Sequence, residues 1–168
     1  MSWFNALKPE SLRDAFIHEI KCAYDMEEQQ ISSLPQFAKA ATYPGLQAMF
    51  DRHHAESREQ LRRLETICER LGEKAEGDTN ASARGLVADG KVAMGMGGDD
   101  ATRDAVLIMC AQSAEHLEIA RYGTLRTWAR ILGEHDIAGL LERSLDEERR
   151  FDRELSELAE AAVNVAAR

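Results

Sequence analysis

Two glutamates on the apolar face of one predicted helix limit what this chain can fold into. Between Asp99 and Leu132, apolar residues recur at steps of three and four, which predicts a helix with one apolar stripe. Glu115 and Glu118 lie on this stripe, one turn apart. A buried carboxylate costs free energy unless it is paired, hydrogen-bonded or bound to a metal. The pair therefore predicts a polar site inside an apolar core.

Three other segments show the same interruption of an apolar helical pattern. The first predicted helix begins near Pro9, the second covers residues 46–71 and the last covers residues 136–163. The interrupting residues are Glu27 in the first, His53 and Glu56 in the second, and Glu148 and Asp152 in the last. Four helices that carry acids or a histidine near their midpoints predict an all-α four-helix bundle with polar groups in its core.

The connections between these segments predict the topology. Pro35 should kink or end the first helix, and Tyr43-Pro44-Gly45 predicts the following turn. The 28-residue interval from Glu73 to Asp100 is rich in glycine and too long for a tight hairpin. It predicts a long crossover with a short helix at Ala81–Met94, as in ferritin-like folds. We expect residues 1–168 to form one such domain.

Composition excludes several classes of function. The chain has 44% apolar and 30% charged residues and a net charge of −9, and it shows no basic patch for nucleic acid or an anionic membrane. No apolar run approaches the roughly 18 residues of a membrane span. The N-terminus lacks the basic and apolar regions of a signal peptide. We therefore expect a cytoplasmic protein that binds neither nucleic acid nor membrane.

The cysteines argue against a thiolate metal site. Cys22, Cys68 and Cys110 are far apart, odd in number and without a CxxC motif. Each lies in a helical pattern, where a free cysteine behaves as a small apolar residue. We predict three free thiols and neither a disulfide framework nor a zinc-thiolate site.

The interrupting residues fit the donor set of carboxylate-bridged di-iron and di-manganese bundles with departures, because they include one histidine instead of two. Glu27 would be the acid of the first helix, and His53 with Glu56 would be a pair in the order HxxE. Either Glu115 or Glu118 would serve from the third helix, and Glu148 from the last, with Asp152 where an imidazole is expected. Carboxylates with imidazole suit iron or manganese. The competing interpretation is a set of structural ion pairs with arginine or lysine.

Several segments carry a resemblance to a known family. They are Tyr24-Asp25-Met26-Glu27-Glu28-Gln29 with Leu34-Pro35, His53-x-x-Glu56-Ser57-x-x-Gln60, Gly85-Leu86-Val87, Glu115-His116-Leu117-Glu118-Ile119-Ala120-x-Tyr122-Gly123 and Glu147-Glu148-x-x-x-Asp152-x-x-Leu155. Together they make the chain, from about Leu12 to Ala159, resemble the YciF-type stress proteins of the ferritin-like superfamily. The resemblance implies a ferritin-like bundle, a homodimer and a link to bacterial stress responses. Trp128 and Phe37, which lie outside the apolar stripes, are candidates for the dimer contact. Trp3, Phe4 and Leu7 either pack on an end of the bundle or contribute to that contact.

The leading hypothesis is a binuclear protein that binds two iron ions, or manganese, and reacts with dioxygen or peroxide. In ferritin-like sites the bridging carboxylates come from the second and fourth helices, which assigns bridging to Glu56 and Glu148. Glu27 and one third-helix acid would be terminal ligands, and His53 would bind one metal. The alternative is a non-catalytic helical dimerisation protein with structural buried carboxylates; a third candidate is an iron-storage cage.

Overall fold

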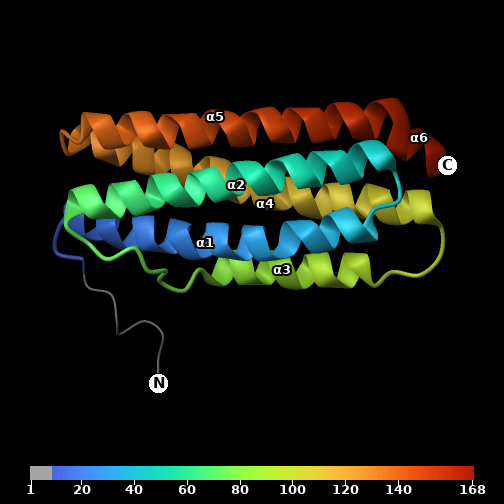
Figure 1. The fold of residues 1–168 in the computed structure, drawn as a ribbon, viewed down its shortest axis with the longest axis horizontal. Helices are drawn as coiled ribbons and strands as arrows, with labels where there is room; N and C mark the ends of the chain where they lie inside the picture. The colour runs from blue at the N-terminus through green and yellow to red at the C-terminus, as the bar shows by residue number, and fades with distance from the viewer. Residues whose placement is uncertain (1–8) are drawn as a thin grey trace, which may run out of the picture.

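The computed structural model describes residues 9–168 and is all-helical over that range (Figure 1). The helices are α1 (Leu12–Ala40), α2 (Pro44–Leu71), α3 (Ala81–Met94), α4 (Asp100–Ile131) and α5 (His135–Leu158), followed by a π-helical turn (Ala159–Val163) and the short α6 (Asn164–Ala166). No strand occurs within residues 9–168. The expected all-α class is confirmed.

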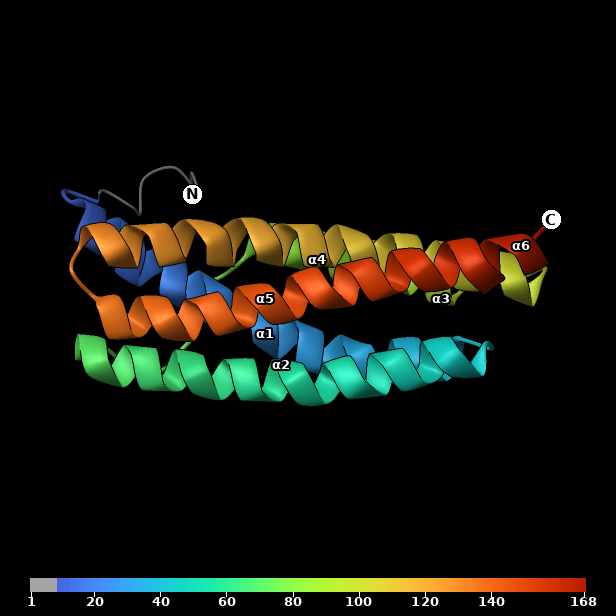
Figure 2. The ribbon, with the colours of Figure 1, turned by 90° about the horizontal axis from the view of Figure 1, so that it is seen from above.

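The long helices form two antiparallel hairpins, α1–α2 and α4–α5, which pack side by side (Figures 1 and 2). The connection from α2 to α4 runs back along the length of the bundle and carries α3, which packs against α1 and α4. This arrangement confirms the four-helix bundle with a long crossover, including a short helix with the predicted bounds.

Local chemistry sets the helix ends, which differ from expectation at the start of α1, after Pro35 and at the end of α5. Ser11 accepts a hydrogen bond from the backbone N–H of Asp14, so α1 begins at Leu12 rather than near Pro9. Pro35 lies inside α1, which continues to Ala40. The last long helix also ends earlier than expected, at Leu158, where the backbone changes to a π-helical turn.

The apolar core has two parts, one toward each end of the bundle. One part includes Phe16, Ile67 and Leu141, and the other includes Phe50 and Leu155. On each long helix, the interrupting polar residues fall between the two parts in the sequence, except for Asp152, which follows Phe151 of the second part. The bundle therefore contains a polar layer with apolar packing on both sides.

The structure also shows where several side chains outside this layer lie. Phe37 is buried against Phe50, with ring centroids 5.4 Å apart, so it belongs to the core rather than to a surface contact. Trp128 is half-buried and packs against the core. Cys22, Cys68 and Cys110 are buried free thiols, as predicted. Trp3, Phe4 and Leu7 lie outside the described residues.

Asp104 joins the start of α4 to the turn between α1 and α2. Its carboxylate accepts hydrogen bonds from the backbone N–H groups of Thr42 and Tyr43 and from the Thr42 hydroxyl, at 2.7–3.1 Å. The residue is only 1% exposed.

Within residues 9–168, none of the helices combines the length and the apolar character that a bilayer crossing requires.

Candidate metal centre

Glu27 places a carboxyl group at the centre of the bundle. It is fully buried on α1, and the hydroxyl of Tyr122 on α4 donates a hydrogen bond to its Oε1 at 2.5 Å. Its Oε2 has no hydrogen-bond partner in the described part of the chain. One oxygen of Glu27 is thus held in place by α4, and the other remains available to a ligand.

His53 on α2 presents an imidazole to acids from three directions. Its Nε2 lies 3.3 Å from Oε1 of Glu115 and 3.5 Å from Oε2 of Glu148, and its Nδ1 lies 3.6 Å from Oε2 of Glu56. The ring stacks on Phe151 of α5, with centroids 3.9 Å apart and planes 10° from parallel. Packing therefore fixes the plane of the ring, and its nitrogens point at carboxylates.

Two glutamine amides orient the remaining acids. Gln30 Nε2 donates to Oε2 of Glu118 at 3.2 Å. Gln60 Nε2 donates to Oε1 of Glu148 and to Glu147, which in turn forms a two-pronged ion pair with Arg63. Each amide satisfies one oxygen of a buried carboxyl and leaves the other without a partner.

The acids and the histidine converge on one point. His53, Glu115, Glu118 and Glu148 each offer one ligand atom, and these atoms all lie within 4.8 Å of one another. All four residues are at most 1% exposed. Among residues 9–168, no partner is found for one oxygen each of Glu115, Glu118 and Glu148, or for either His53 nitrogen, within hydrogen-bond geometry. Such orphaned groups are expensive in a protein interior.

The electrostatics of this cluster disfavour the ionised forms of its buried acids. Burial raises the pKa of Glu27 to about 7, although the hydrogen bond from Tyr122 opposes the rise. Burial and neighbouring carboxylates also raise the pKa values of Glu118 and Glu148 well above the usual range. Burial alone would lower the pKa of His53, but Glu115 and the other acids around it raise it to about 10. A bound cation would supply the missing positive charge.

The structure places Glu56 at the rim of the cluster. One oxygen lies 2.7 Å from Arg150, and the other faces His53. Burial raises the pKa of Glu56, but His53 and Arg150 outweigh burial and lower it below the usual value. Of the seven predicted ligands, Glu56 is thus the one that pairs with an arginine within the described residues.

The structure does not bring Asp152 into the cluster. Its Oδ1 accepts a hydrogen bond from Gln112 at 3.1 Å and lies 3.5 Å from Nε2 of His116, whose side chain is 70% exposed. The seven predicted ligands therefore divide into three sets. Glu27, His53, Glu115, Glu118 and Glu148 are buried together, Glu56 lies at the rim, and Asp152 lies outside.

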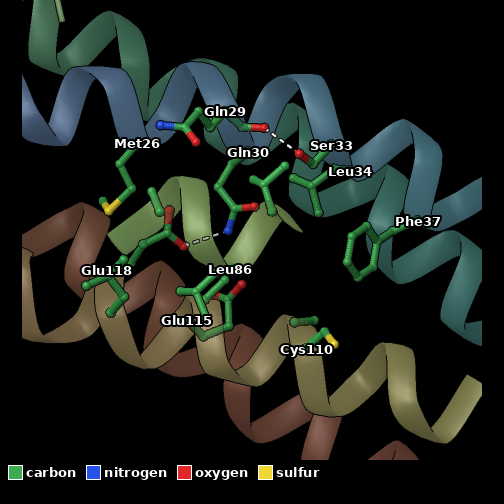
Figure 3. A pocket seen from close by; sticks show the side chains of 15 residues that line it. Met26, Gln29, Gln30, Ser33, Leu34, Phe37, Leu86, Cys110, Glu115 and Glu118 are labelled. Atoms are coloured by element: carbon green, nitrogen blue, oxygen red, sulfur yellow. Dashed lines mark hydrogen bonds between the residues drawn. The ribbon is translucent and has the colours of Figure 1, made fainter. Parts of the chain in front are cut away.

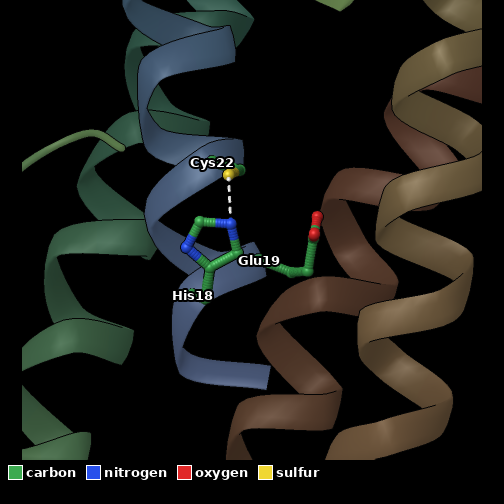
Figure 4. Close-up of side chains that lie close together, drawn as sticks. All are labelled: His18, Glu19 and Cys22. Carbon is green, nitrogen blue, oxygen red and sulfur yellow. Dashed lines mark hydrogen bonds between the residues drawn. The ribbon is translucent and has the colours of Figure 1, made fainter. Parts of the chain in front are cut away.

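A second group of metal-type side chains lies near the start of α1 (Figure 4). His18 uses one ring nitrogen toward Asp78 and the other toward the Cys22 sulfur, at 3.1 and 3.4 Å. Glu19 is paired with Arg121, and burial raises the pKa of Cys22 to about 11. These groups satisfy one another, and a protonated thiol is a poor ligand, so this group is a weak candidate for a metal.

Sequence reasoning did not assign a supporting role to Gln30, Gln60 or Phe151. Ser57 and Gln60 were visible as polar residues on the apolar stripe of the second helix, one and two turns after His53. Gln30 and Phe151 gave no separate signal, because a glutamine at a helix surface and a phenylalanine in a core are both ordinary.

Comparisons with known proteins agree with the fold. A family described as a domain of unknown function, DUF892, matches residues 11–168. Protein YciF of Escherichia coli K12 is 34% identical over 155 residues, which is 92% of this chain and 93% of that protein. The crystal structure of the E. coli stress protein YciF superposes with a TM-score of 0.88 and 33% identity, over 92% of this chain and 98% of that chain.

Two further solved structures are similar. YcfI from Rhodopseudomonas palustris has a TM-score of 0.87 and 32% identity, over 91% of this chain and 98% of that chain. A protein from Xanthomonas campestris has a TM-score of 0.73 and 24% identity, over 91% and 94% of the two chains, and shows the shared fold alone.

Proposed function

Because this chain belongs to the DUF892 family and keeps a carboxylate and histidine cluster inside its bundle, we propose that it is a binuclear metal protein. It holds two iron ions, or two manganese ions, in the polar layer between the two hairpins. By its similarity to a protein called a stress protein, we place its role in a stress response.

One observation carries this proposal: the buried acids are not neutralised by arginine or lysine. Within the described residues, no lysine or arginine nitrogen lies within 4.0 Å of a carboxylate oxygen of Glu27, Glu115, Glu118 or Glu148. Structural ion pairs, the competing explanation of buried acids, are thus missing at these four positions. Four carboxyls and one imidazole remain, and ligand atoms of His53, Glu115, Glu118 and Glu148 lie within 4.8 Å of one another.

The donor set fits hard, oxygen-preferring ions with some affinity for imidazole. Iron and manganese meet this description, whereas structural zinc sites favour thiolates. Glu27, Glu115, Glu118, Glu148 and His53 would hold the pair, and Glu56 would join them if it leaves Arg150. When bound, iron would supply electron transfer to dioxygen or peroxide.

The protein's own residues would prepare this site in three ways. Tyr122 holds Glu27, Gln30 holds Glu118 and Gln60 holds Glu148, so each acid keeps one oxygen free for an ion. Phe151 fixes the imidazole plane of His53. The apolar packing above and below the layer limits the access of water and strengthens every charge interaction within it.

The alternative function is a helical dimerisation protein whose acids are only structural. The ion pairs of Glu56 with Arg150 and Arg52 favour it at that one position. The proposal and the alternative differ in what happens to added metal, because only the first requires stoichiometric binding.

Anaerobic calorimetric titration of the metal-free protein with Fe(II) tests the proposal. We expect two ions per chain, and loss of at least one ion in Glu148→Gln. Glu157→Gln, which removes an exposed acid from the same helix, is the matched control and should keep both ions. His54→Ala and His135→Ala should also leave the stoichiometry unchanged. If the unmutated protein binds no metal, the dimerisation function replaces this one.

A further inference from the structure

A small apolar cavity lies beneath α3 and reaches two of the buried acids (Figure 3). Side chains from α1, α3 and α4 line it, and its volume is about 30 Å³. Leu34, Leu86 and Ala111 are among its apolar lining residues, and Glu115 and Glu118 close its inner end. The cavity therefore touches the polar layer from the side covered by the crossover.

The polar side chains on its walls are directed elsewhere. Ser33 donates its hydroxyl to the carbonyl of Gln29 at 2.8 Å, and the Gln29 amide donates to Asp25 at 2.6 Å. Only at the inner end do polar groups face the space, where Gln30 donates to Glu118 (Figure 3). There, Oε2 of Glu115 and Oε1 of Glu118 have no hydrogen-bond partner among residues 9–168. The cavity is thus apolar along its walls, with open carboxylate oxygens at its end.

The outer wall, α3, is attached to α1 at both ends. At its start, the backbone N–H of Asn80 donates to Asp25 at 2.8 Å, and its side-chain amide donates to the carbonyl of Cys22 at 3.3 Å. Toward its end, Gly90 approaches Phe37 so closely that an added Cβ would lie 2.6 Å from the ring. Leu86 lies between these attachments and covers the cavity.

We propose that this cavity is a binding site for dioxygen next to the metal-binding acids. The purpose of such a site rests on the proposed function. Its volume is close to that of one small molecule and far below the roughly 150 Å³ of an apolar cavity that binds benzene. Hydrogen peroxide would have to lose hydrogen bonds to water on entering such walls, whereas dioxygen has almost none to lose. Size and polarity therefore select an apolar diatomic molecule, and the open end delivers it to Glu115 and Glu118.

Krypton, a small apolar atom with an anomalous X-ray signal, tests the cavity without any metal. In crystals of the metal-free protein under krypton pressure, we expect one site between Leu86 and Ala111. Ala114→Leu, which fills the cavity from α4, should remove the site. Ala120→Leu adds the same side chain at an exposed position of α4 and should retain it. No krypton in the unmutated protein, or krypton that persists in Ala114→Leu, would overturn the proposal.

A kinetic comparison then tests the assigned ligand. In the Fe(II)-loaded protein, Ala114→Leu should slow oxidation by dioxygen about fivefold or more, as blocked access does. Oxidation by hydrogen peroxide and the Fe(II) stoichiometry should stay as in Ala120→Leu. Equal slowing with both oxidants, or none with dioxygen, would contradict a dioxygen site. Failure to bind Fe(II) would instead count against the proposed function and would leave the krypton result standing.

Discussion

The Tyr122 hydroxyl on α4 donates a hydrogen bond of 2.5 Å to the Glu27 carboxyl on α1, across the centre of the bundle. Tyr122→Phe removes the only hydrogen-bond partner that the described residues give Glu27. We expect the metal-free protein to lose about 1–3 kcal/mol of unfolding free energy, the usual cost of an unsatisfied buried polar group. Urea denaturation measures this loss. Tyr24→Phe is the control, because Tyr24 is also buried but lies away from the cluster, and an equal loss there would contradict the prediction.

Arg150 competes with metal for Glu56, since it lies 2.7 Å from one of its oxygens. Arg150→Ala should therefore tighten Fe(II) binding by up to about fivefold, the scale of a partly exposed ion pair. Arg153→Ala removes the same charge from an exposed position of α5 and should change the affinity less. If both variants change the affinity equally, only the general charge matters and Glu56 is not a ligand.

The metal-free protein should lose stability as pH rises. The pKa of Glu27 is raised from 4.5 to about 7, so the folded chain keeps a proton there that the unfolded chain releases, and stability falls across this range. The pKa of His53 is raised from 6.5 to about 10, which makes stability fall further between those values. Thermal denaturation across both ranges measures the slope.

Variants separate Glu27 from the other titrating groups in that experiment. Glu27→Gln should flatten the lower part of the pH dependence, and Glu157→Gln should leave it unchanged. Added Fe(II) should reverse the trend, because metal ions bind the deprotonated carboxylates. If the stability of the metal-free protein rises between pH 4.5 and about pH 7, the assignment to Glu27 is wrong.

Among the acids outside the cluster, Asp104 should cause the largest loss of unfolding free energy when it is removed. Its carboxylate accepts hydrogen bonds from Thr42 and Tyr43 and ties the start of α4 to the α1–α2 turn. Asp104→Ala leaves the N–H groups of Thr42 and Tyr43 without this charged acceptor, and we expect it to cost about 3 kcal/mol of unfolding free energy. Asp100→Ala, one turn earlier with a side chain that is 66% exposed, should cost far less.

We also predict a homodimer. Phe37 no longer supports it, since it is buried in the core, but α4 exposes Met109 and Ile131 at 59% and 68%. Light scattering at micromolar concentration should give twice the mass of one chain. A monomer mass would leave these residues as ordinary surface positions.

The helical fold could be predicted from the sequence because the signals for helices are local. Periodic apolar residues located the long helices, and the glycines after Leu71 located the crossover. The sequence could not show how tertiary contacts change the residue at which a helix ends. Pro35 lies within an α1 that is held by neighbours on both sides of it, so tertiary packing outweighed its cost.

The candidate site was predictable only in part, for a similar reason. An acid on an apolar stripe signals burial, which found Glu27, Glu115, Glu118 and Glu148. Asp152 follows Glu148 by one turn but points to Gln112 and His116, because residues four apart on a helix share a face only approximately. Partners from other helices, such as Gln30 and Gln60, depend on how the hairpins rotate against each other, which no single helix pattern encodes.

The division of the buried layer between the two hairpins has a consequence for folding. Glu27 and His53 come from α1–α2, whereas Glu115, Glu118 and Glu148 come from α4–α5, with the whole crossover between them in the chain. Each hairpin is built from contacts near in sequence and can form early, but joining the hairpins requires distant contacts. Without a counter-ion, that joining must also bring acids together and leave polar groups without partners. A cation that binds both halves would lower this barrier and make the availability of metal a control on how quickly newly made chains become mature.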